Sequence, residues 1–187
     1  SLIEANLTGA DLDNADLTDA VIYYANLSDA VLTNADLGRA DLTDTNLEDA
    51  DLSEASLIEA NLNGSDLEYA NLTNADLSYA DLTYADLTNA DLEGAVLADA
   101  DLANADLTDA DLTNANFSGA DLLKSYFNGA VIDGTDFTDA VLDLAQVKSL
   151  CERATGKTSE SLQCSGLNQD YVPASKSVNK FNPGIGR

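Results

Sequence analysis

Acidic side chains recur at short, regular intervals through most of the chain, and they are the residues best able to do chemistry. The 187 residues include 34 acidic and 8 basic side chains and no histidine, for a net charge of −26. Repeated carboxylates could buffer divalent cations, but a specific calcium site needs several oxygens that converge from a curved loop. The glycine-rich nonapeptide of calcium-binding β-rolls is also absent. We therefore expect no metal site and no cofactor.

The same residues do not form a catalytic constellation. The sequence offers no histidine, no nucleophile beside a base and no phosphate-binding glycine loop, and its carboxylates are spread out rather than gathered in one stretch. The sequence thus predicts that the protein is not an enzyme. A charge of −26 repels nucleic acid, so direct nucleic acid binding is not expected. No apolar run approaches the roughly 20 residues of a membrane-spanning helix, so no membrane span is expected either.

The two cysteines, Cys151 and Cys164, are the other reactive side chains. Two cysteines without a histidine make a zinc site a poor explanation. A disulfide fits better, and closing a loop of this size stabilises a fold by about 3 kcal/mol. Two reduced, buried thiols in a cytoplasmic protein are the alternative. If the disulfide forms, the protein belongs in an oxidising compartment such as the periplasm, the thylakoid lumen or the cell exterior.

A repeat of five residues organises most of the chain. Every fifth residue from Leu2 to Leu142 is Leu, Ile or Phe, and two positions before it stands Ala or another small residue. A period of five matches neither the 3.6 residues of a helix nor the two of a flat strand. It predicts a short extended segment and a turn in each repeat, with the large residue and the small one pointing inward, so that the chain coils around its own core.

A second period of twenty residues sets the number of sides per coil at four. The residues that replace alanine at positions 45, 65 and 125 differ by multiples of twenty, and so do Phe117 and Phe137. Outward residues twenty apart should then stack about 4.8 Å apart. The expected columns are Asp81, Asp101 and Asp121; Asp66, Asp86 and Asp106; and Asn6, Asn26 and Asn46.

These residues, A(D/N)LxN and A(D/N)LxD in tandem, resemble the pentapeptide repeat family over about positions 1–143. The resemblance implies an all-β solenoid, a right-handed quadrilateral β-helix with four pentapeptides per coil and about seven coils here. Some bacterial members resemble duplex DNA in shape and charge and bind DNA gyrase. The leucine-rich repeats and the two-cysteine end also look like those of the lumenal pentapeptide proteins of cyanobacteria and chloroplasts.

The repeat ends after Leu142, and residues 144–166 are expected to form a small helical cap. Helical spacing starts at Leu144 with Asp143 as its cap and stops near Gly156. Thr158 or Ser159 would start a second helix that runs to about Cys164. Such a lid would cover the open strand edges of the last coil. Residues 167–187 are expected to be an irregular tail that docks in part on the rod.

The sequence predicts a non-enzymatic structural or protein-interaction module that presents flat acidic faces, in the thylakoid lumen or periplasm. The alternative is a cytoplasmic DNA mimic that binds DNA gyrase or another DNA-binding enzyme. Tyr79 and Tyr84 are the candidate surface contact, because both point outward on neighbouring sides and aromatic residues are enriched at interfaces. End-to-end self-association of the rods is an open possibility, and the protein partner is unknown.

Overall fold

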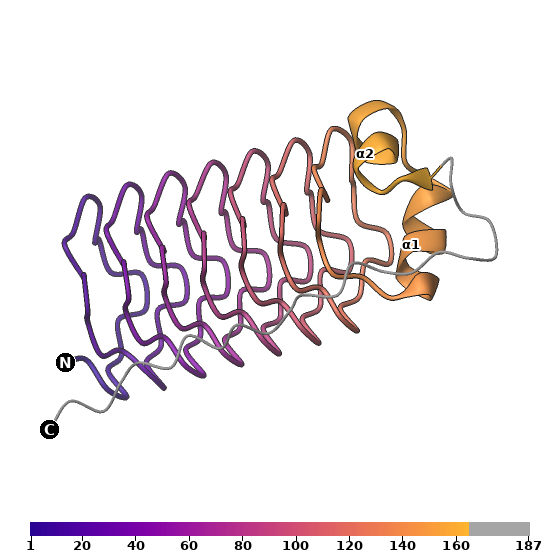
Figure 1. Ribbon diagram of the computed structural model, residues 1–187. Helices are drawn as coiled ribbons and strands as arrows, with labels where there is room; N and C mark the ends of the chain where they lie inside the picture. Colours follow the sequence, from indigo (N-terminus) through magenta and orange to yellow (C-terminus); the bar gives the residue numbers. More distant parts are fainter. Residues whose placement is uncertain (165–187) are drawn as a thin grey trace, which may run out of the picture.

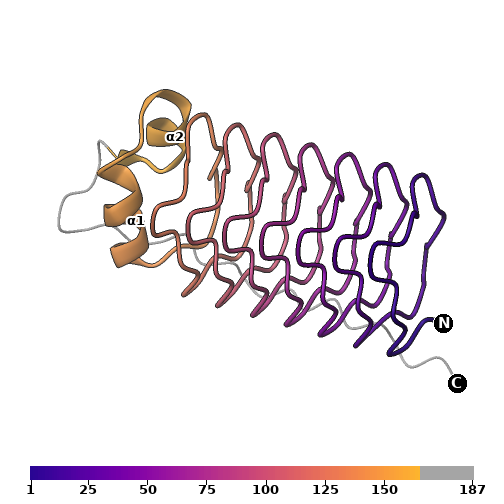
Figure 2. The same cartoon turned by 180° about the vertical axis from the view of Figure 1, so that it is seen from behind.

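The computed structural model describes residues 1–164, and these residues form a stack of coils with two helices at one end (Figure 1). The view from behind shows the same stack, with the N-terminus at the end away from the helices (Figure 2). The expected tail at 167–187 lies outside the described residues, as do the last two positions of the expected cap.

Each coil is twenty residues long. Parallel bridges join residues twenty apart along all four sides, for example Asn6 to Asn26 and Asp81 to Asp101. All three expected columns are therefore present. Within each repeat, three backbone N–H groups donate to the neighbouring coils. Two of them donate to the following coil, as Leu7 N does to Asn26 O at 2.7 Å and Gly9 N does to Ser28 O at 2.8 Å. The third donates to the preceding coil, as Asn26 N does to Ala5 O at 2.9 Å. The coils are thus joined by a continuous backbone ladder.

The corners between sides are tight turns closed by a hydrogen bond from the alanine N–H to the carbonyl of the inward residue, such as Ala10 N to Leu7 O at 2.9 Å. The third residue of each turn, the second after the inward residue, has a φ between +50° and +74°. This left-handed conformation is typical of type II turns and favours Gly and Asn. It explains why Asn, Asp and Gly are so frequent at this position of the repeat.

The residue just before each inward side chain also has a structural role. Where it is Asp or Asn, its side-chain oxygen accepts a hydrogen bond from the backbone N–H two residues on, as Asp86 Oδ1 does from Thr88 N at 3.0 Å. That N–H lies in the turn and has no place in the ladder. The acidic columns are therefore part of the backbone hydrogen bonding as well as a solvated surface.

The inward side chains fill the coils from the second coil onward, whereas the inward leucines of the first coil are only partly buried. From Ile22 to Leu142 the large inward residues and their alanine partners are at most 7% exposed. The polar substitutes for alanine are buried too, and their hydroxyls are satisfied: Ser65 Oγ donates to Leu62 O at 2.8 Å, and Thr135 Oγ1 donates to Leu112 O at 2.8 Å. Phe117 and Phe137, twenty residues apart, stack with centroids 5.6 Å apart.

Helix α1 (Leu144–Cys151) begins where the sequence predicts, because Asp143 forms a capping box with Gln146. Helix α2 (Gly156–Ser161) differs from the prediction. Its N-cap is Thr155 rather than Thr158 or Ser159, and Gly156 is its first residue rather than the end of the preceding helix. Thr158 is instead buried, with its hydroxyl donating to Ile132 O at 2.8 Å, which places it against the last coil.

Candidate functional site

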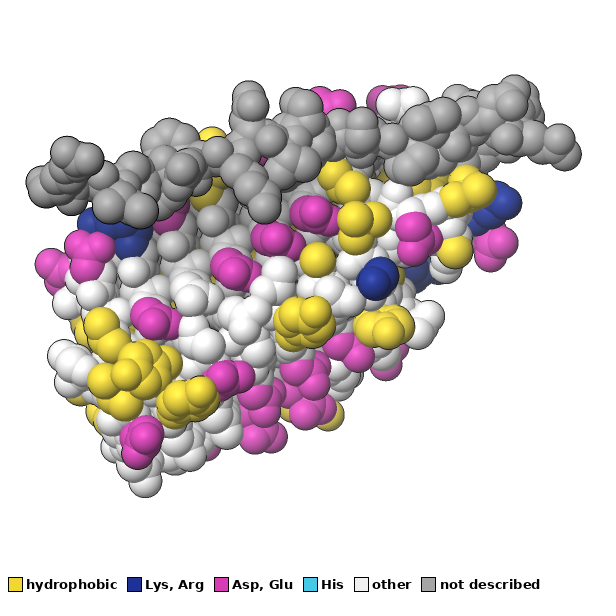
Figure 3. Space-filling view, turned by 60° about the horizontal axis from the view of Figure 1, so that its bottom comes forward, with side chains coloured by type: hydrophobic (Ala, Val, Ile, Leu, Met, Phe, Trp, Pro, Cys, Tyr) yellow, Lys and Arg dark blue, Asp and Glu magenta, His cyan; other side chains and the backbone are white. Residues whose placement is uncertain are grey.

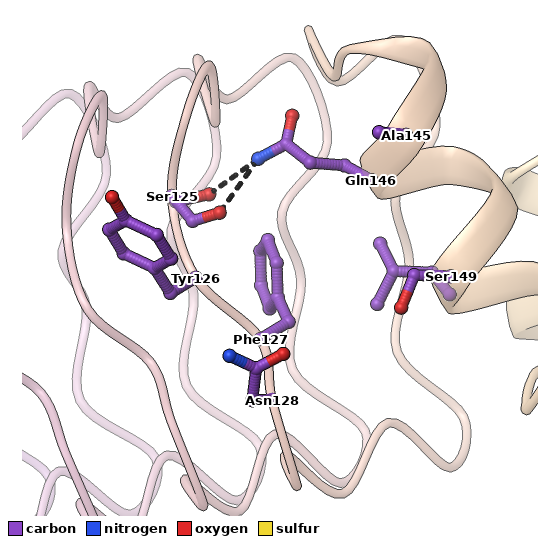
Figure 4. Close-up of a pocket in the computed structure, with 8 residues that line it drawn as sticks. Ser125, Tyr126, Phe127, Asn128, Ala145, Gln146 and Ser149 are labelled. Carbon is purple, nitrogen blue, oxygen red and sulfur yellow. Dashed lines mark hydrogen bonds between the residues drawn. The ribbon is translucent and has the colours of Figure 1, made fainter.

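Side chains of α1, of α2 and of the segment between them supply some of the hydrogen bonds that a further coil would have made. In the repeat, the alanine-position carbonyl accepts from the N–H of the residue 21 positions later. Ser125 O would be paired in this way with the N–H of residue 146, and it is the side-chain Nε2 of Gln146 that donates to it, at 2.9 Å. Gln146 Nε2 also donates to Leu122 O at 2.7 Å. Figure 4 shows the amide reaching from α1 to Ser125.

Arg153 acts in the same way at the next corner. Its guanidinium donates to Ala130 O at 2.6 Å and to Phe127 O at 3.0 Å. On a further side, the Ser161 hydroxyl accepts from the backbone N–H of Phe137 at 3.1 Å. The sequence does not predict these roles of Gln146, Arg153 and Ser161, because their partners are backbone groups at an edge that only the coiled chain creates. These contacts pair part of the last coil's open edge.

Cys151 and Cys164 are joined by a disulfide with Cα atoms 5.5 Å apart. Cys151 is the last residue of α1, and Cys164 follows the end of α2. The bond therefore holds together the two helices whose side chains cover the last coil. The described residues contain no free cysteine.

A hollow of about 170 Å³ lies between the last coil and α1. Its lining includes Tyr126, Phe127, Asn128, Gln146 and Ser149 (Figure 4). The Gln146 amide is already occupied on both sides, because its Nε2 donates to the coil and its Oε1 accepts from Asp143 N at 2.7 Å. The hollow therefore results mainly from the packing of α1 against the last coil.

Tyr79 and Tyr84 occupy consecutive corners of one coil, and their side chains are 61% and 66% exposed. Both have a φ of +62°, a conformation that is unfavourable for a bulky residue. Their rings do not pack on each other: the aromatic pairs among residues 1–164 involve only Tyr23 with Tyr24 and Phe137 with Phe117 or Phe127. Tyr69 shares these features, with 52% exposure and a φ of +59°. Its unusual place at a corner usually held by Asn, Asp or Gly is visible in the sequence.

The sides of the rod combine carboxylates with scattered apolar groups, as the face in Figure 3 shows. Hydrogen bonds from the Thr18 hydroxyl and backbone N–H lower the pKa of Asp16. Partial burial, with the nearby charges of Asp66 and Asp49, instead raises the pKa of Glu48.

Basic residues are rare on the rod. Arg39 pairs with Asp19 directly along a column, with Nε–Oδ1 and Nη2–Oδ2 distances of 2.7 and 2.8 Å. This bidentate pair lowers the pKa of Asp19 and raises that of Arg39. Both side chains are more than half exposed, so the pair adds little stability.

Neither a metal centre nor a membrane segment is found in the described part of the chain. Residues 1–164 contain no group of three or more His, Cys, Asp or Glu side chains arranged to hold a metal ion. The helices in the same range lack the length and apolar character that crossing a bilayer requires.

The protein is a β-solenoid: its inward residues fill a buried core, and its charged and polar side chains lie on four outer sides. The chain belongs to the pentapeptide repeat family, whose model matches residues 1–39, 35–74, 55–94, 75–114 and 105–143. Family membership confirms the expected right-handed quadrilateral β-helix. No curated protein sequence matches the chain significantly.

Three solved structures illustrate the likeness. HetL, a pentapeptide repeat protein involved in heterocyst differentiation regulation in the cyanobacterium Nostoc, is 32% identical over 74% of this chain and 73% of its own, with a TM-score of 0.55. QnrB1, a plasmid-mediated fluoroquinolone resistance protein, is 24% identical over 81% and 85%, with a TM-score of 0.67, and this likeness concerns the fold alone. A protein from the Arabidopsis thaliana thylakoid lumen is 30% identical over 84% and 90%, with a TM-score of 0.38.

Proposed function

We propose that this protein is a non-enzymatic module that binds a protein partner through the flat, acidic sides of its rod. One observation carries the proposal: between the first and last coils the backbone ladder is continuous and the core is buried, so that the charged and polar groups available to a partner along the rod are those on its outer sides. The rod would comprise about seven coils over residues 1–143, with residues 144–166 as its cap. A small-molecule site is a poor fit to these flat sides.

The proposal is tested by placing a photo-crosslinking residue on each side of one coil in turn. Thr73, Ser78, Thr83 and Thr88 are suitable because each directly follows one of four successive inward residues, at the start of a corner, and so marks the end of a different side. Irradiation in the native cell should yield the same crosslinked polypeptide from one side or two adjacent sides. The other two sides are the matched controls. Equal capture from all four sides, or none from any, would contradict a specific interaction face.

The proposal extends to an oxidising compartment, the thylakoid lumen or the periplasm, because Cys151 and Cys164 form the only disulfide among the described residues and it ties the cap together. Thiol labelling of protein taken directly from its native source should find both cysteines blocked until a reductant is added. Two reactive thiols in that material would favour the cytoplasm instead.

A second candidate function is charge mimicry of DNA toward gyrase or another DNA-binding enzyme. The observation that favours it is the density of charge: residues 1–143 carry 31 of the 34 acidic side chains and only two of the eight basic ones. Duplex DNA has one charge per about 1.7 Å, and a rod of about seven coils spaced about 4.8 Å apart has a linear charge at least comparable with that. A DNA supercoiling assay with purified gyrase tests this candidate function directly. An unchanged supercoiling rate in the presence of this protein at micromolar concentration would exclude mimicry toward gyrase.

A further inference from the structure

We infer that Tyr69, Tyr79 and Tyr84, here called the tyrosine belt, form with the carboxylates between them a docking surface for an arginine-rich segment of a protein partner. The inference rests on the proposed function and specifies the chemistry of the partner. The tyrosines stand at corners that disfavour bulky residues, they border two adjacent sides of the rod, and carboxylates surround them.

The fold requires a positive φ at every corner, but no contact inside the molecule explains why tyrosine stands at the belt corners. Each stands at a corner with a φ between +59° and +62°, where Asn, Asp and Gly are the favoured residues and a bulky side chain is strained. Strain of this kind is normally offset elsewhere, but these rings are between 52% and 66% exposed and join no aromatic pair among residues 1–164. Unrecovered strain at an exposed aromatic residue points to a role at the surface.

The three rings border two adjacent sides of the rod. Tyr79 and Tyr84 stand at the two ends of the side that carries Asp81, and Tyr84 also starts the side that carries Asp86. Tyr69 lies at the far corner of that second side, one coil earlier, because its N–H donates to Thr88 O at 3.1 Å. Carboxylates thus alternate with tyrosine rings across two faces that share the Tyr84 corner.

The negative charge around the belt favours a basic partner. No Lys or Arg occurs between Arg39 and Lys124, so the belt lies within the most uniformly acidic part of the chain. Asp81 and Asp86 each accept their backbone hydrogen bond through one oxygen, Oδ1, and remain at the surface. A guanidinium group can stack on a tyrosine ring and pair with a carboxylate at the same time, whereas an ammonium is a more strongly hydrated point charge. Arginine is therefore the expected ligand residue.

The test measures binding of deca-arginine and deca-lysine to the full chain by calorimetry at an ionic strength of about 0.15 M. The test variant combines Tyr69→Asn, Tyr79→Asn and Tyr84→Asn, which leaves the net charge unchanged and suits the corner conformation. The control variant combines Tyr23→Asn and Tyr126→Asn, which remove aromatic rings outside the belt and outside the corners with a positive φ. Circular dichroism and thermal unfolding establish that both variants are folded.

We expect deca-arginine to bind the parent protein more tightly than deca-lysine, and the belt variant to weaken deca-arginine binding about tenfold or more. The control variant should stay within about twofold of the parent, since it retains the belt and the charge. Equal binding of both peptides together with an unchanged belt variant would overturn the inference, because charge alone would then account for binding. So would a parent that binds neither peptide, or one that instead self-associates through the belt. Specific crosslinking to a partner in the cell would still support the proposed function in each of these cases.

Discussion

At the scale of single residues, each position of the repeat has its own physical requirement. The inward residue and its alanine partner fill the core, the preceding Asp or Asn accepts a backbone hydrogen bond, and the second residue after the inward one must tolerate a positive φ. Tyr84 does not suit the positive φ of its position, so the folding of the rod does not explain why a tyrosine stands there.

Replacing Tyr84 by asparagine should stabilise the rod. Asparagine tolerates the left-handed corner, whereas a bulky residue there costs about 1 kcal/mol. Urea unfolding should show the gain for Tyr84→Asn. Tyr84→Ala is the matched control, because alanine removes the ring but keeps most of the conformational cost. Equal stability of the two variants would mean that the corner is not strained.

Two substitutions of Asp86 distinguish the contribution of its hydrogen bond to stability from that of its charge. Asp86→Ala removes the acceptor for Thr88 N–H and should lower the free energy of unfolding by about 1 kcal/mol. Asp86→Asn keeps an acceptor and relieves repulsion from Asp66 and Asp106 in the same column, so it should be neutral or stabilising. A loss of stability as large in the asparagine variant as in the alanine variant would contradict the role of the hydrogen bond.

At the scale of elements, the coil and the cap are joined by side chains that take the place of backbone. Gln146 is the clearest case, because it stands twenty residues after Tyr126 and its amide donates to the carbonyl that a next coil would have paired. The first turn of helix α1 therefore places Gln146 where the next coil would have continued, and the rest of the helix departs from the path of the rod. The disulfide holds α1 to the segment after α2, so the helices cover the edge together.

The substitution Gln146→Glu tests this junction without changing the size of the side chain. Glutamate retains an acceptor for Asp143 N–H but cannot donate to Ser125 O and Leu122 O. Leaving Ser125 O unpaired should lower the free energy of unfolding by about 1–3 kcal/mol, whereas Leu122 O keeps its hydrogen bonds from Ser125. Gln163→Glu makes the same change at an exposed position and is expected to have little effect. The account of the cap fails if both variants unfold at the same urea concentration.

Sequence alone predicts the elements that repeat and misses those that depend on the finished coil. The spacing of Leu2 through Leu142 gives the period, and exceptions such as Phe117 and Phe137 give the four sides. Gly156 is misassigned, because a glycine with a positive φ is typical of a helix end and here begins α2. The contacts of Arg153 cannot be predicted, since its acceptors become an open edge only once the chain has coiled.

At the scale of the whole molecule, charge is the dominant feature. Stacked carboxylates such as Asp66, Asp86 and Asp106 repel one another, and interleaved amides relieve part of this, as Asn71 Nδ2 does by donating to Asp51 Oδ1 at 3.1 Å. The remaining repulsion is spread along the rod and is screened by salt. The same charge that opposes folding is what a basic partner would recognise.

Stability should therefore rise with added salt at neutral pH, and it should depend on pH in two opposite ways. The raised pKa of Glu48 means that mild acid protonates it in the folded state first and adds stability. Burial by itself would raise the pKa of Asp51 and Asp136, but hydrogen bonds from Ser53 and Thr138 outweigh it and lower both values. The stability that these two contribute is present above their ordinary pKa and is lost as the pH falls below about 4. A melting temperature that is flat or falls with salt at pH 7 would contradict this electrostatic account.

The measurement that tests the coil most directly is the distance between two spin labels on one column. Labels at Ser28 and Thr108, introduced through a non-natural residue so that the disulfide stays intact, are four coils apart. The twenty-residue coil predicts a narrow distribution of backbone separations near 19 Å, from about 4.8 Å per coil. A broad distribution centred near about 50 Å, as a flexible chain of that length would give, would contradict the stacked coils.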